Sequence, residues 1–169
     1  RDLKVPCLEV GGNGVDTTAT ADWDETQARA YLYWTPAAWA SVGTAYHFDR
    51  FEQSEDFTLG TLDLKTHMLP VSVNLFSPSG FSAGLTGTYV NQRGDFINTA
   101  SDPVARYRDS DHFWIFDAAV SYRLPNRYGK LTLQIKNLFD ERFRFQETDT
   151  KNPRLAAGRS VLGRLVLSF

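Results

Sequence analysis

The stretch LPVSVNLFSPSGFSAGLTGTY, residues 69–89, decides the fold of this chain. Apolar residues or glycine occupy every second position from Leu69 to Leu75 and again from Phe81 to Tyr89, and mostly small or polar residues lie between them. Successive side chains of a strand point to opposite faces, so each half predicts a strand with one apolar face. The intervening Ser77–Gly80 has the composition of a tight turn, and the whole stretch therefore predicts a β-hairpin.

The same alternation recurs along the rest of the chain. It predicts strands at residues 26–34, 37–51, 114–123, 131–136 and 160–169, and a weaker one at residues 3–10. No segment has a convincing helical period of about 3.6 residues. Together with the hairpin, these segments predict an all-β fold: an antiparallel transmembrane β-barrel wall of about eight strands that follow one another up and down.

The connecting segments alternate between short and long. Thr35–Ala37, Ser77–Gly80 and Pro125–Gly129 are predicted tight turns, whereas residues 11–24, 52–60, 94–111 and 140–158 are predicted long polar loops. In an up-and-down sheet all three turns then lie at one end and the loops at the other. Outer-membrane barrels have this arrangement, with the short turns on the periplasmic side.

Aromatic residues gather at both ends of the predicted apolar faces. Aromatic rings favour the two membrane–water interfaces, with aliphatic residues between them. The pattern predicts an integral protein of the bacterial outer membrane, with its C-terminus in the periplasm and its apolar face against lipid and lipopolysaccharide. The rings beside the turns are Trp34, Phe76, Phe81, Tyr122 and Phe169, and those near the loops are Tyr46, Phe48, Tyr89, Trp114 and Phe139.

The opposite faces of the strands predict a polar lumen. We expect the stripe of Arg29, Tyr31 and Tyr33 to pack and form salt bridges there rather than to line a substrate path. Arg159 and Arg164 are expected to pair with carboxylates such as Asp140, or with headgroup phosphates. The candidate lumen-facing residues are Arg29, Tyr31, Tyr33, Asp117, Arg123, Lys136 and Arg164.

Composition narrows the classes of function. A net charge of −2 does not provide the clustered positive field that nucleic acid requires. No apolar window reaches about 18 residues, which excludes a transmembrane helix, and a single cysteine excludes an internal disulfide. The three histidines are scattered, so we predict no catalytic grouping, no metal site and no cofactor. The acidic run Asp109–His112 is expected to be a solvated loop end.

The segment Lys136–Phe143 resembles the penultimate-strand motif of TonB-dependent outer-membrane receptors, whose core here is Asn137, Leu138, Phe139 and Asp140. Residues 116–124 are similar to the preceding strand in that family. Residues 158–169, which end in Phe169, are similar to its last strand. The resemblance covers about the last third of the chain, and the first two-thirds share only the strand pattern.

This resemblance implies a barrel of about 22 strands with an N-terminal plug. Such receptors take up iron chelates, cobalamin or other scarce nutrients with energy from the inner membrane. A chain of 169 residues cannot form that many spanning strands, so we expect residues 1–169 to be a C-terminal segment of a larger barrel, without the plug. The resemblance also implies that assembly machinery reads the C-terminal strand, and that TonB acts through a part outside this sequence.

Two other interpretations remain open. One is a self-contained eight-stranded outer-membrane barrel with a structural, adhesive or narrow-pore role. The other is a soluble lipocalin-like carrier, whose apolar faces would turn inward. The membrane interpretation requires Leu32, Val73 and Leu133 to face outward rather than to pack together inside a shell.

Overall fold

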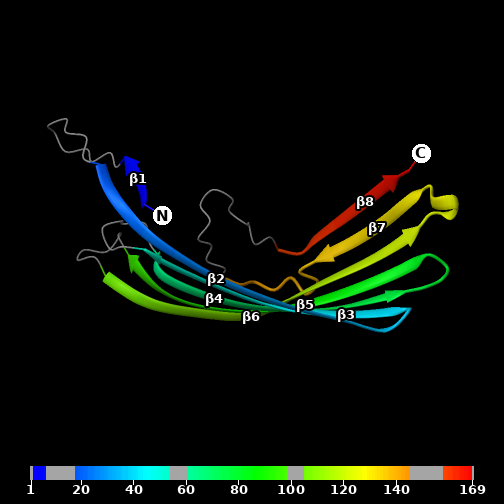
Figure 1. Ribbon diagram of the computed structural model, residues 1–169, viewed down its shortest axis with the longest axis horizontal. Coiled ribbons are helices and arrows are strands. Elements are labelled where there is room, and N and C mark those ends of the chain that lie inside the picture. Colours follow the sequence, from blue (N-terminus) through cyan, green and yellow to red (C-terminus); the bar gives the residue numbers. More distant parts are fainter. Residues whose placement is uncertain (1, 7–17, 54–60, 99–104, 145–157, 169) are drawn as a thin grey trace.

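The computed structural model describes residues 2–6, 18–53, 61–98, 105–144 and 158–168, and they form a single sheet layer (Figure 1). One short 3-10 turn, η1, spans Pro125–Arg127. The strands are β1 (Asp2–Pro6), β2 (Thr18–Ala37), β3 (Ala40–Gln53), β4 (Thr61–Phe76), β5 (Phe81–Asn98), β6 (Ala105–Arg123), β7 (Gly129–Lys136) and β8 (Ser160–Leu167).

Every strand pairs antiparallel with its neighbours in the sequence. Strands β2 to β8 form a continuous up-and-down sheet of seven strands, and the short β1 adds to the N-terminal end of β2. The predicted all-β, antiparallel, up-and-down architecture is therefore confirmed. The predicted barrel is not confirmed, because among the described residues the sheet stays open and β8 pairs only with β7.

The register places the predicted apolar positions of all strands on one face. Val42 on β3 lies opposite Val73 on β4, and Val73 lies opposite Leu85 on β5. On the other side of the hairpin, Val120 on β6 lies opposite Leu133 on β7. Alternate residues of each strand then share the second face, which near the turns bears residues such as Ser72, Thr86 and Thr132.

Two of the three predicted turns match the structure. Ser77–Gly80 joins β4 to β5, and Gly80 has a φ of +91°, which glycine adopts without strain. The prediction for the first turn, Thr35–Ala37, is wrong. Strand β2 continues to Ala37, and the chain reverses at residues 38 and 39. The register is irregular between Trp34 and Ala37. This irregularity accommodates Pro36, because proline has no N–H group to donate to the strand pairing.

The strands run further from the turns than predicted. Parts of the predicted loops 11–24, 52–60 and 94–111 belong to β2, β3, β5 and β6. In the parts that belong to β5 and β6 polar and charged residues replace most of the apolar ones, and one pair of opposite charges lies across the two strands. Asp95 lies opposite Arg108, and such cross-strand pairs stabilise a sheet. The Asp109–His112 run lies inside β6, so its prediction as a loop end is wrong.

The sheet is curved, and its two faces differ in exposure. Near the turns, Val71, Val73 and Leu75 are exposed, whereas the intervening Ser72 and Asn74 are half-buried. Side chains crowd together on the concave side of a curved sheet, so the polar face is the concave one. Further from the turns this concave face becomes apolar, and it buries Leu64, Val90, Phe96 and Phe113 around the Gln92–Thr66 hydrogen bond of 2.9 Å.

Gly129 gives a direct test of the β7–β8 pairing. Its φ is +152°, and a Cβ at this position would overlap the Val166 carbonyl oxygen on β8. We expect Gly129→Ala to lower the free energy of unfolding by at least about 2 kcal/mol. Urea unfolding followed by far-UV circular dichroism measures the change.

Gly163, on β8 in the same strand pair, is the matched control. A Cβ there meets no heavy atom within 4 Å, so Gly163→Ala should change stability by less than about 1 kcal/mol. Equal losses in the two variants would contradict the close approach at Gly129.

Candidate functional site

The convex face has a broad aliphatic surface with no protein cover in the described part of the chain. The relative exposure is 66% for Leu32, 40% for Val73, 49% for Leu85 and 52% for Leu133. These residues lie on four different strands of the sheet, so the surface crosses its whole width. Soluble monomers rarely expose continuous apolar patches of this kind, and such patches mark a site of contact with a membrane, another protein or a ligand.

Aromatic residues border this aliphatic surface near the turns. Phe81 and Tyr122 lie opposite each other on β5 and β6, with ring centroids 4.5 Å apart. Trp34 is 64% exposed on the same face of β2. Phe76 was predicted to belong to this group, but it lies opposite Ser82 and so belongs to the concave face. Phe169 lies outside the described residues.

A second aromatic border lies on the loop side of the aliphatic surface. Its rings contact one another in a chain: Tyr89 to Trp114 at 5.2 Å, Trp114 to Phe116 at 5.9 Å, and Phe116 to Phe139 at 5.4 Å between centroids. On β3 and β4 the border continues in the cluster of Tyr46, Phe48 and His67. The Tyr46 hydroxyl lies 2.7 Å from His67 Nδ1, and the Phe48 ring packs 4.9 Å from the His67 ring.

The turn-side border crosses the strands obliquely. The cross-strand partners of Trp34 are Val42 on β3, then Val73 on β4 and Leu85 on β5. The aromatic residue of the border on β5 is Phe81, which lies four residues nearer the turn than Leu85. Four residues correspond to about 14 Å of strand, and three strand spacings to about 14 Å of sheet. The border is therefore inclined by about 43° to the strand-pairing direction. The loop-side border shifts in the same sense, from Phe48 and Tyr46 on β3 to Trp114 and Phe116 on β6.

The separation of the two borders follows from β5. Tyr89 lies eight residues beyond Phe81, which corresponds to about 27 Å along the strand. With the strands inclined by about 43°, the two aromatic levels are about 20 Å apart in height. This is close to the apolar band of about 25 Å that outer-membrane strands present to lipid.

The seven candidate lumen residues all fall on the concave face by register, but they do not converge on one site. Tyr33 packs over Gly43 on β3, and the Tyr31 ring meets the edge of His47 at 5.7 Å. Arg29 lies 3.4 Å from the Gln27 amide oxygen, and Asp117 accepts a hydrogen bond from the Asn137 backbone. The remaining three, Arg123, Lys136 and Arg164, are exposed.

The family-motif residues form a compact turn directly after β7. Asn137 is 3% exposed, has a φ of +51°, and bridges the turn with its side chain: its amide nitrogen donates to the Glu141 carbonyl and its amide oxygen accepts from the Glu141 N–H, both at 2.9 Å. Its own N–H donates to Asp117 on β6. Leu138 N–H donates to the Phe116 carbonyl, which continues the pairing with β6 by one step.

The end of the Asn137 turn ties β7 to β8 and to the concave face. Asp140 accepts a hydrogen bond of 2.8 Å from the Arg159 backbone N–H, just before β8. The expected link between these residues therefore exists, although the backbone makes it rather than the guanidinium. Phe143 stacks on the buried Phe113 at 4.3 Å, and Arg144 N–H donates to Asp111 on β6. These contacts cover part of the concave apolar cluster.

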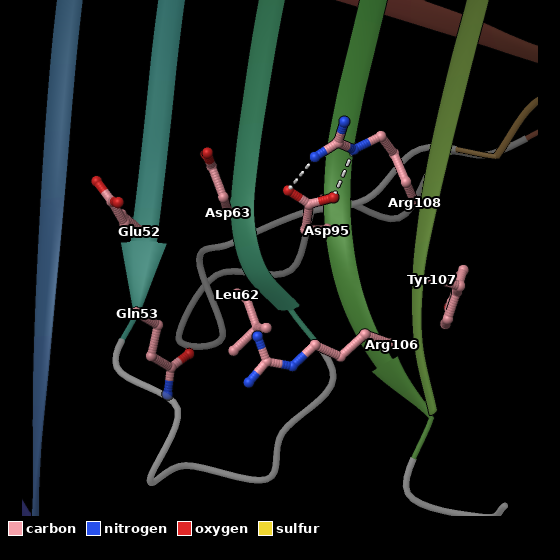
Figure 2. A pocket seen from close by; sticks show the side chains of 8 residues that line it. All are labelled: Glu52, Gln53, Leu62, Asp63, Asp95, Arg106, Tyr107 and Arg108. Atoms are coloured by element: carbon pink, nitrogen blue, oxygen red, sulfur yellow. Dashed lines mark hydrogen bonds and ion pairs between the residues drawn. The ribbon is translucent and has the colours of Figure 1, made fainter. Parts of the chain in front are cut away.

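Beyond the loop-side aromatic border the convex face becomes charged, a feature that sequence analysis missed. Arg50 lies 3.1 Å from Glu52 and 3.6 Å from Asp63, and Lys65 lies 3.3 Å from Asp63. Figure 2 shows the Asp95 carboxylate held by two hydrogen bonds from Arg108, at 2.7 and 3.2 Å. An open hollow at this end is lined by Glu52, Gln53, Leu62, Asp63, Asp95, Arg106, Tyr107 and Arg108.

The Asp95–Arg108 ion pair changes the titration of both of its partners. The hydrogen bond from Arg108 lowers the pKa of Asp95 below its ordinary value, and Asp95 raises the pKa of Arg108. Because the folded pKa of Asp95 is the lower one, any contribution of the pair to stability is present at neutral pH. It is lost as the pH falls through the lowered value.

The described residues provide no cluster for metal binding. They contain no group of three or more His, Cys, Asp or Glu side chains placed to hold a metal ion. Asp109 and Asp111 instead face Arg144, which lies 3.8 Å from Asp109 through its guanidinium. No helix in this part of the chain is both long enough and apolar enough to cross a membrane.

Asn137 allows the contribution of the turn to be measured. Asn137→Ala removes both bonds to Glu141 and places alanine at a positive φ, so we expect the free energy of unfolding to fall by about 2–3 kcal/mol. Asn126→Ala is the control, because Asn126 has a φ of +52° but is exposed. It should lose only about 1 kcal/mol, and equal losses in urea unfolding would show that the side-chain bridge contributes nothing.

Comparisons with protein-family models, with curated proteins and with solved structures found no match to this chain. A fold alone does not define a function. The function must therefore be inferred from the chemistry of the two faces.

Proposed function

We propose that this chain forms part of the membrane-spanning wall of an outer-membrane β-barrel of the TonB-dependent-receptor type, which passes a small molecule across the membrane. The observation that supports this most is the exposed aliphatic surface on the convex face, bordered by two aromatic levels about 20 Å apart. Hydrocarbon covers such a surface without a specific partner, and amphipathic rings suit the two headgroup levels.

The inclination of the turn-side border supports the same orientation. Strands of outer-membrane barrels are tilted by about 35–45° from the membrane normal. The line from Trp34 to Phe81 is inclined by about 43° to the strand-pairing direction, and this angle follows from the register alone. A membrane surface would thus cut this sheet along the line on which its aromatic residues lie.

An open sheet is not a stable end state in lipid. The outer edge of β8 has backbone groups without a partner strand in the described part of the chain, and each unsatisfied group in hydrocarbon costs several kcal/mol. Further strands must therefore cover this edge. We propose that the sheet is one arc of a larger barrel, whose lumen lies on the concave side.

The role in uptake rests on the Asn137 turn and on the polar concave face. The sequence of the turn resembles the receptor motif, and the two side-chain hydrogen bonds between Asn137 and Glu141 explain why an asparagine suits this position. The concave face near the turns has polar residues that suit a wet lumen or a polar plug, with an iron chelate or a similar nutrient as the transported molecule. Lipopolysaccharide, the barrel-assembly machinery and the TonB system are the proposed partners.

A lipocalin-like carrier is a weaker proposal. In such a carrier Leu32, Val73 and Leu133 would pack together on the inside of the sheet. They lie on the convex face with 40–66% exposure, and the half-buried residues beside them are polar. The self-contained eight-stranded barrel shares the lipid-facing surface and differs only in how the open edge is closed.

The lipid-facing surface is tested by Leu133→Arg. At mid-bilayer depth an arginine costs about 2–4 kcal/mol, so the variant should lose this much stability in phosphatidylcholine vesicles, measured by guanidinium unfolding. Gln134→Arg is the matched control, because Gln134 is the next residue of β7 and lies on the concave face. It should cost less than about 1 kcal/mol, and the opposite ranking would reverse the assignment of the faces.

Transport is tested in cells that express the complete reading frame containing this chain. Deleting the gene should abolish uptake of a radiolabelled iron chelate or a related nutrient, and a protonophore should abolish uptake in wild-type cells, because receptors of this type depend on inner-membrane energy. Uptake that survives the protonophore would favour a passive pore. Unchanged uptake after deletion, over a panel of such nutrients, would refute the transport role.

A further inference from the structure

Three basic residues form a row across the convex face, beyond the loop-side aromatic border. Arg50 on β3 lies directly opposite Lys65 on β4, and Lys65 lies directly opposite Arg93 on β5. Like charges directly opposite one another destabilise a sheet. A row of three cations therefore needs anions to balance it, and we call these three residues the basic row.

The acidic neighbours of the basic row balance only part of it. Arg50 and Lys65 contact Asp63, and Arg50 also contacts Glu52. Asp95, the carboxylate next to Arg93 along β5, is already engaged by Arg108. Arg93 is exposed and forms no ion pair with any described residue, so the β4–β5 end of the row retains unbalanced positive charge.

The height of the basic row corresponds to one layer of a membrane. Arg93 lies four residues beyond Tyr89 on β5, which is about 14 Å along the strand and about 10 Å in height at an inclination of about 43°. The headgroup region beyond the hydrocarbon is roughly 5–8 Å deep on each side. Long side chains such as arginine and lysine reach several ångströms along the surface, so Arg93 and Lys65 reach the level of lipid phosphates.

The next row along the strands restricts where an anion can bind. Glu52, Asp63 and Asp95 lie opposite one another on β3, β4 and β5, two residues further from the aromatic border than the basic row. Their carboxylates repel a phosphate from the outer side. On the membrane side lie Asn91 and His112, opposite each other on β5 and β6, which can donate hydrogen bonds. An anion is therefore favoured on the side of the row that faces lipid.

We propose that Lys65 and Arg93, supported by Arg50, bind a phosphate group of an anionic outer-leaflet lipid of the lipid A type. The proposal rests on the membrane orientation proposed above and adds a specific headgroup site to it. Arginine binds phosphate through paired N–H donors and lysine as a point charge. The two side chains lie on adjacent strands on the exposed convex face, which gives a lipid access from the bilayer side.

The site is tested with the purified complete barrel that contains this chain, in phosphatidylcholine vesicles that contain a small fraction of diphosphoryl lipid A. Binding is measured by vesicle flotation over a lipid A titration. Arg93→Gln and Lys65→Gln should each weaken the preference for lipid A about fivefold, as expected for one basic side chain at an anionic surface. Lys130→Gln removes the same charge at the turn end of β7, on the concave face, and should leave the preference unchanged.

The outcomes separate this inference from the proposed function. Quenching of tryptophan fluorescence by brominated phosphatidylcholine reports insertion independently of lipid A, and a complete barrel that fails to insert contradicts the membrane orientation itself. If the barrel inserts, and the wild type, Arg93→Gln and Lys130→Gln all bind lipid A equally well, only the headgroup site is contradicted. Equal competition by inorganic phosphate at matched phosphate concentration would identify a free-anion site instead and would overturn the lipid assignment.

Discussion

The pairing register of the strands is the constraint on which the other features depend. Each backbone ladder from β2 to β8 places apolar residues opposite apolar residues, so seven separate alternating segments combine into one continuous aliphatic surface. Because the side-chain period of a strand is two, a shift of one residue in any pair would move that strand's apolar residues to the other face. The aromatic borders, the polar concave face and the basic row all result from this one alignment.

Local patterns predicted the parts of the fold that depend on single strands. The order of the strands, the direction of their apolar faces and the turn at Ser77–Gly80 follow from period two and from turn chemistry. The first turn was misplaced because Pro36 is a turn signal in sequence, whereas in the structure it lies in an irregular part of the β2–β3 pair. Phe76 was misassigned for a similar reason, since its face is fixed by the register with Ser82 rather than by its aromatic character.

The features missed from the sequence are those that require two strands at once. Residues 94–111 are polar and read as a loop, but Asp95 and Arg108 neutralise each other across β5 and β6 and extend the sheet. The Asn137 turn was suggested by its sequence motif, whereas the bond from its backbone N–H to Asp117 depends on β6 lying alongside. Whether the sheet closes is a property of its edges, and no pattern within a strand determines it.

The change of polarity along each face has a consequence for how the sheet is held in place. Between the turns and the level of Tyr89 the convex face is apolar and the concave face is polar. Beyond Tyr89, around Leu64 and Phe113, the concave face is apolar and the convex face is charged. A shift of one residue in the pairing register would move the side chains of both halves of a strand to the face of opposite polarity. In the proposed membrane orientation, a slip of two residues would keep the faces correct but would move a cation such as Lys65 or Arg93 toward hydrocarbon. The alternation of polarity and the basic row together set the position that each strand would take along the proposed membrane normal.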